Sequence, residues 1–137
     1  MSGIKELLRS ESDGSISFGD PSLDSKSKLE DFKHAGDLLK VKTFKEITRL
    51  EKNGSFLYES VPGTAVSNFS ETAEGISFTV EGPEDAMITV GLAEDAEYEV
   101  RVGDAEAGRM KTNLGGKLAM SVELAGAGAV KVEIKKI

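Results

Sequence analysis

Close pairs of acidic residues are the first feature of this 137-residue chain that could carry chemistry. The pairs are Glu84-Asp85, Glu94-Asp95 and Glu97 with Glu99, and paired carboxylates are typical of cation sites and glycosidase centres. A calcium loop needs carboxylates that alternate around a turn glycine, as in D-x-[DN]-x-[DN]-G, and no stretch has that pattern. We therefore interpret the pairs as solvated turn charges and expect neither a metal ion nor a cofactor.

A single histidine, His34, limits proton-transfer chemistry. One histidine forms neither a multi-histidine metal site nor, without suitable partners, a nucleophilic triad, and the chain has no cysteine. Its neighbours Ala35-Gly36 predict a surface loop. Gly103–Gly108 lacks the G-x-x-x-x-G-K-[ST] pattern of a phosphate-binding loop and is predicted to be a hairpin loop. With four arginines and one histidine, we expect a non-enzymatic protein.

One hairpin has the composition of a recognition surface. Asn53-Gly54 predicts a two-residue turn, which sets Leu50 opposite Leu57 and places Phe56 and Tyr58 on one face with Arg49 and Glu51 of the neighbouring strand. Aromatic rings on a β-face stack on sugars or anchor protein interfaces. The alternative is that these rings pack in the core.

Alternation of apolar and polar residues with a period of two indicates the elements that hold these side chains, and it runs from Leu38 onward. Turn glycines and asparagines separate the segments into hairpins: Asp13-Gly14, Asn53-Gly54, Asn113–Gly116 and Gly126–Gly128. Three short helices are the only helical possibilities, at Ile4–Arg9, Lys28–His34 and Phe44–Leu50. The alternation predicts a buried set that comprises Ile76, Phe78, Val80, Ile88, Val90, Val100, Val102, Met120, Val122, Val132 and Ile134.

The predicted fold class is all-β, an antiparallel β-sandwich of immunoglobulin-like or jelly-roll-like type with an N-terminal hairpin extension. Val61–Thr64 contains Pro-Gly and suggests a boundary between residues 1–64 and the sandwich proper at 65–137. Residues 1–64 have too few apolar residues for a core of their own. We expect them to add to the same sheets, in one continuous fold, or to the sheets of another copy.

Charge is distributed unevenly along the chain, whose formal net charge is −7. Lys26–Lys52 carries eight basic and five acidic residues, whereas Glu71–Glu106 carries eleven acidic residues and one basic residue, Arg101. An acidic chain repels a phosphate backbone, so we expect no nucleic-acid partner. The opposite charges of the two stretches predict head-to-tail contacts between copies, in a homo-oligomer or a filament.

Two groups of segments carry a family resemblance. They are Leu39–Thr48 with Tyr58–Val66, and Val80–Thr89 with Lys111–Leu118. Together they resemble short β-rich proteins of Gram-positive anaerobes that often carry the label "endosialidase", a resemblance that implies a role in glycan hydrolysis. Tyr98–Leu124 also resembles hairpins of bacterial immunoglobulin-like and fibronectin-like modules, which implies a fold.

These observations favour a structural, self-assembling β-sandwich protein. The first alternative is a carbohydrate-binding module that uses the face with Arg49, Glu51, Phe56 and Tyr58, and the second is an accessory part of a glycan-acting hydrolase system. The opening residues show no secretory signal and no apolar run approaches the length of a membrane span, so we expect a cytoplasmic protein without a membrane partner.

Overall fold

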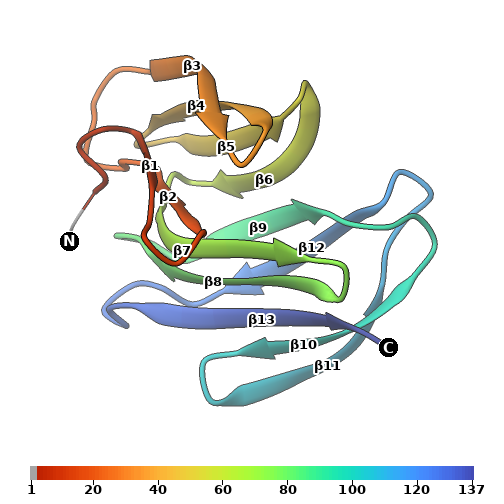
Figure 1. Cartoon of the computed structure of the whole chain (residues 1–137). Helices are drawn as coiled ribbons and strands as arrows, with labels where there is room; N and C mark the ends of the chain where they lie inside the picture. The colour runs from red at the N-terminus through yellow and green to blue at the C-terminus, as the bar shows by residue number, and fades with distance from the viewer. Residues whose placement is uncertain (1–2) are drawn as a thin grey trace.

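The computed structural model describes residues 3–137, which form two antiparallel β-sheets packed into a sandwich (Figure 1). The seven-stranded sheet has the order β1-β2-β7-β8-β13-β10-β11 and the six-stranded sheet the order β12-β9-β6-β5-β4-β3. The strands of the first sheet are β1 (Leu8–Ser10), β2 (Ile16–Phe18), β7 (Ala65–Thr72), β8 (Gly75–Glu81), β10 (Glu97–Val102), β11 (Ala105–Lys111) and β13 (Val130–Lys136). Those of the second are β3 (Ser27–His34), β4 (Asp37–Phe44), β5 (Ile47–Lys52), β6 (Ser55–Val61), β9 (Ala86–Gly91) and β12 (Lys117–Val122). The predicted all-β sandwich is confirmed.

The three helical possibilities are wrong, because the described residues contain no helix. Lys28–His34 belongs to β3, which pairs with β4 through a bulge between Leu29 and Phe32. Asp31, inside the bulge, has a φ of 57°. The extra residue of the bulge interrupts the alternation with period two, so the pattern of this stretch did not distinguish a strand from a short helix.

The core lies between the inner faces of the sheets, where side chains with a period of two meet. Every residue of the predicted buried set is buried except Val102, which is half-buried near the end of β10. Four aromatic rings pack at the centre, with neighbouring centroids 5.2 to 6.1 Å apart and mostly edge-to-face: Phe18, Tyr58, Phe69 and Phe78. Edge-to-face contacts of this kind suit the ring quadrupoles.

The segments before and after residue 64 share both sheets. β2 pairs with β7, and β6 pairs with β9. The hydrophobic core also contains residues of both segments, for example Phe18 from the first and Phe78 from the second. The N-terminal hairpin thus extends the protein's own seven-stranded sheet (Figure 1).

Two of the predicted hairpin turns instead connect the two sheets. Asn113–Gly116 leads from β11 in the seven-stranded sheet to β12 in the six-stranded sheet, and Gly126–Gly128 leads from β12 back to β13. Glycine and asparagine supply the same positive φ to a crossover as to a hairpin, so the turn residues alone did not distinguish them.

Candidate functional site

The predicted recognition face is divided by a β-bulge. Tyr58 pairs with Leu50, and Phe56 pairs with Glu51, so Leu57 is the extra residue and does not pair with Leu50 as predicted. Leu57 and Tyr58 therefore both point inward, and Tyr58 is fully buried. Tyr58 thus packs in the core, as the alternative predicted, and its predicted place on the exposed face is wrong. Arg49, Glu51 and Phe56 lie together on the outer face of the six-stranded sheet.

Tyr58 belongs to a buried hydroxyl network. Its hydroxyl lies 2.9 Å from Thr64 Oγ1, which is also 2.7 Å from Ser60 Oγ. Burial raises the pKa of the Tyr58 phenol far above its usual 10.0. The phenol is thus a neutral core group, out of reach of a glycan.

Phe56 is surrounded by cations. The Arg49 guanidinium lies over its ring, 5.3 Å from the centroid, and the Lys117 ammonium lies 4.7 Å from it. Lys117 reaches the ring across Gly91, which has no side chain in between; a Cβ there would lie 2.5 Å from the Phe56 carbonyl oxygen. Because two cationic side chains lie against the Phe56 ring, the ring offers little free surface for a sugar to stack on.

Three cations lie in register beside this ring. Lys28 on β3 pairs with Lys42 on β4, and Lys42 pairs with Arg49 on β5. Like charges directly opposite one another on adjacent strands are destabilising. Arg49 is partly compensated by Glu51 and Glu59, each with a carboxylate oxygen 3.3 Å from a guanidinium nitrogen. We call Lys28, Lys42 and Arg49 the cation row.

An apolar row crosses the same face about two residues further along the strands. Val61 on β6 pairs with Met87 on β9, and they are 51% and 49% exposed. Thr48 pairs with Ser60, so Ile47 on β5 and Val61 are the next residues along these two strands. Two residues span about 7 Å along a strand, which puts Ile47, Val61 and Met87, the apolar row, beside the cation row.

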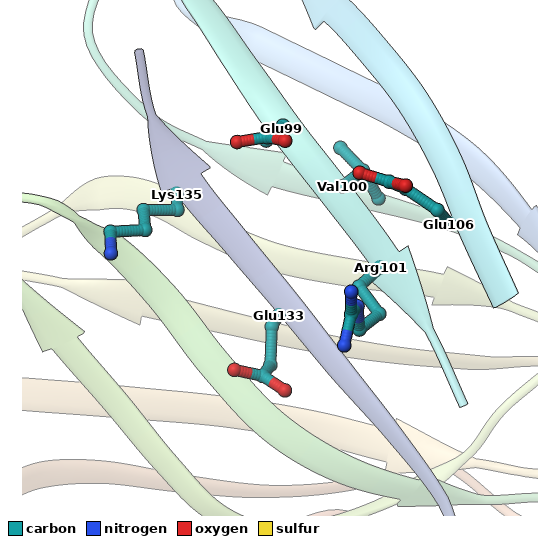
Figure 2. Close-up of a pocket in the computed structure, with 6 residues that line it drawn as sticks. All are labelled: Glu99, Val100, Arg101, Glu106, Glu133 and Lys135. Atoms are coloured by element: carbon teal, nitrogen blue, oxygen red, sulfur yellow. The ribbon is translucent and has the colours of Figure 1, made fainter. Parts of the chain in front are cut away.

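The outer face of the seven-stranded sheet has a contrasting pattern. Across its three strands at one edge, opposite charges face each other: Glu97 and Lys111, Glu99 and Arg109, Glu99 and Lys135, Arg101 and Glu133, and Arg101 and Glu106. Figure 2 shows five of these side chains around a shallow hollow on β10, β11 and β13. Opposite charges in register stabilise a sheet. The carboxylates around this hollow are therefore explained by cross-strand pairing.

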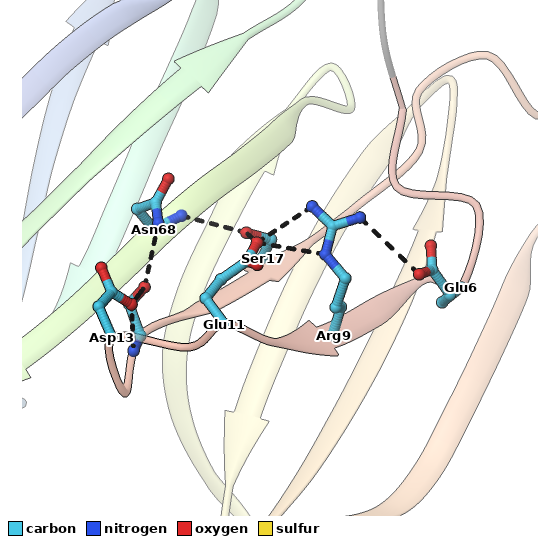
Figure 3. Close-up of polar contacts among 7 residues, drawn as sticks. Glu6, Arg9, Glu11, Asp13, Ser17 and Asn68 are labelled. Atoms are coloured by element: carbon cyan, nitrogen blue, oxygen red, sulfur yellow. Dashed lines mark hydrogen bonds and ion pairs between the residues drawn. The ribbon is translucent and has the colours of Figure 1, made fainter.

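A second polar cluster fixes the N-terminal hairpin (Figure 3). Glu11 accepts hydrogen bonds from the Arg9 guanidinium at 3.0 and 3.2 Å and from the Ser17 hydroxyl. The Ser17 hydroxyl, and secondarily Arg9, lower the pKa of the Glu11 carboxyl. The backbone N–H of Asn68 on β7 donates to Ser17 Oγ at 3.2 Å, which links the hairpin to the rest of the sheet.

His34 is also committed to the fold. Its Nε2 lies 3.0 Å from the Gly14 carbonyl oxygen and its Nδ1 2.8 Å from Ser10 Oγ. A carbonyl only accepts, so Nε2 is the donor in the contact with Gly14. His34 is the last residue of β3, beside the Ala35-Gly36 turn, and is half-buried, so it is not in a surface loop as predicted.

Within residues 3–137, no group of three or more His, Cys, Asp or Glu side chains is arranged to hold a metal ion. No helix there has the length and apolarity to cross a membrane.

The apolar row was missed in the sequence, although a signal for it exists. In Met87–Gly91 the inward residues Ile88 and Val90 alternate with Met87, Thr89 and Gly91, so Met87 occupies a position where the pattern calls for a polar residue. On β6 the inward residues are Tyr58 and Ser60, so Val61 likewise occupies an outward position where the pattern calls for a polar residue.

Comparisons with protein-family models, with curated proteins and with solved structures returned no match to this chain.

Proposed function

We propose that this protein is a non-enzymatic structural β-sandwich that assembles with copies of itself through the outer face of its six-stranded sheet. The exposed pair Val61 and Met87, in register on two central strands, carries the proposal. Neighbouring apolar side chains that are half exposed on a sheet face are typical of interaction surfaces.

The composition of the face supports a protein interface. Interface cores are enriched in methionine, arginine and aromatic residues, and this face combines Met87, Arg49 and Phe56. The other outer face of the sandwich provides an internal comparison, because residues of opposite charge are in register across β10, β11 and β13. The two outer faces thus differ in the residues that point away from the core. This difference is not needed to pack the core.

Single substitutions on the two faces test the proposal. We expect Met87→Lys or Val61→Lys to abolish association in sedimentation velocity, since either places a charge in the apolar row. Thr79→Lys, on the outer face of β8, is the matched control and should sediment like the parent chain. Equal association of the Met87→Lys variant and the parent chain would exclude this face.

The carbohydrate-binding alternative now depends on Phe56 without Tyr58. Binding of an oligosaccharide on a glycan array that is lost in Phe56→Ala would support it against the structural proposal. The glycan-hydrolase alternative rests on the family resemblance alone.

A further inference from the structure

A second surface of the chain combines an exposed apolar side chain with exposed carboxylates. Leu114, in the connection between β11 and β12, is 83% exposed, more than any other large apolar side chain in the part of the chain that the structure describes. Glu94 and Asp95, in the connection between β9 and β10, are also exposed. We call Leu114, Glu94 and Asp95 the tip.

Hydrogen bonds join the two connections into one rigid unit. The Asp95 N–H donates to the Asn113 carbonyl at 3.3 Å, and the Thr112 hydroxyl donates to the Ala93 carbonyl at 2.7 Å. Asn113 Oδ1 accepts from the N–H groups of Gly115 and Lys117, at 2.9 and 3.0 Å, and so closes the loop around Leu114. The apolar side chain is therefore presented on an ordered backbone, which reduces the entropy lost on binding.

The tip and the six-stranded face are complementary in charge and polarity. The face presents cations in register, Lys28, Lys42 and Arg49, beside the apolar row, whereas the tip presents carboxylates beside Leu114. Carboxylates placed against the cation row would relieve its like-charge repulsion. Asp95 already pairs with Lys111 at 3.0 Å, which leaves Glu94 as the carboxylate without an ion pair among the described residues.

The two surfaces do not overlap. Met87 is the second residue of β9 and Glu94 lies three residues beyond the end of that strand at Gly91, so about 13 Å of strand and the start of the connection separate them (Figure 1). One copy can therefore use its face and its tip at the same time.

Building on the proposed function, we infer that the partner of the six-stranded face is the tip of a second copy. Such a contact is heterologous, and repetition gives a closed ring or an open filament. A face-to-face dimer would instead use the same surface on both copies.

Complementation between defective variants distinguishes the two arrangements. Met87→Lys removes a functional face but keeps the tip, and a double variant, Glu94→Lys with Leu114→Lys, removes the tip but keeps the face. Alone, each variant should sediment as the 14.6 kDa monomer. Mixed in equal amounts, they should form a species of twice that mass and nothing larger, because only one face and one tip remain functional. A misfolded variant could not restore association in this way.

The remaining outcomes each reject a specific statement. If the tip variant associates like the parent chain while Met87→Lys does not, the tip is excluded and self-assembly through the face stands. If both variants are monomeric and the mixture stays monomeric, the heterologous contact is rejected. A parent chain that is itself monomeric rejects the proposed function along with this inference. Thr79→Lys, on the outer face of β8 in the seven-stranded sheet, is the control and should associate normally.

Discussion

Five hydroxyl groups, together with the Thr64 backbone, form a hydrogen-bonded network inside the sandwich, between the sheets' apolar side chains. Thr48 donates to the Thr64 carbonyl at 2.9 Å, so Thr43, 2.8 Å away, is the donor to Thr48. Thr64 Oγ1 in turn contacts Ser60 and Tyr58. All five side chains are fully buried. The network anchors the segment after β6 to β4 and β5, and thus fixes where the chain leaves one sheet for the other.

Thr64→Val should test this network with little change in shape. The substitution leaves the Tyr58 and Ser60 hydroxyls without a shared partner, and an unsatisfied buried polar group costs about 1 to 3 kcal/mol. We expect the free energy of unfolding, measured with urea, to fall by about that amount. Thr79→Val on the outer face should change it by less than about 0.5 kcal/mol. Equal effects of the two substitutions would show that the buried hydrogen bonds contribute nothing specific.

At the scale of elements, Gly75 determines how closely β8 approaches β13. Gly75 has a φ of +152°, and a Cβ at this position would lie 1.8 Å from the Ile134 carbonyl oxygen. The register that pairs Gly75 with Lys135 therefore requires a residue without a side chain.

Gly75→Ala should destabilise the protein through both strain and collision. Backbone strain alone costs about 1 to 3 kcal/mol, and the clash with backbone atoms adds to it. Gly126, with a φ of +70° and no atom near its virtual Cβ, provides the control. We expect the melting temperature to fall further for Gly75→Ala than for Gly126→Ala, and the reverse order would contradict the assigned register.

The sequence predicted the strands well where alternation is uninterrupted and poorly where it is not. Ile76–Val80 and Val130–Ile134 pack as predicted, because each buries every second residue. The bulge at Leu57 reversed the expected orientation of Tyr58, since one extra residue shifts all later side chains to the opposite face. The choice between hairpin and crossover at Asn113–Gly116 depends on which sheet receives β12, and the local turn residues contain no information about that.

At the scale of the whole molecule, the charge asymmetry of the sequence becomes a difference between surfaces. The basic stretch Lys26–Lys52 supplies the cation row of the six-stranded face. The acidic stretch Glu71–Glu106 is divided between turns, such as the tip, and outer-face positions that oppose cations. The N-terminal strands, which were predicted to exchange with another copy as one possibility, are part of the protein's own sheet and core. The proposed self-assembly therefore uses exposed surface and not strand exchange.

The most direct test of self-assembly through the six-stranded face is the weight-average mass of the full chain by light scattering across a concentration series. We predict that the mass rises with protein concentration at low ionic strength. The mass should fall only in part at about 1 M salt. Charges more than about 3 Å apart are screened there, whereas the apolar contacts persist. A mass that stays at 14.6 kDa at every protein concentration in low salt would contradict the account.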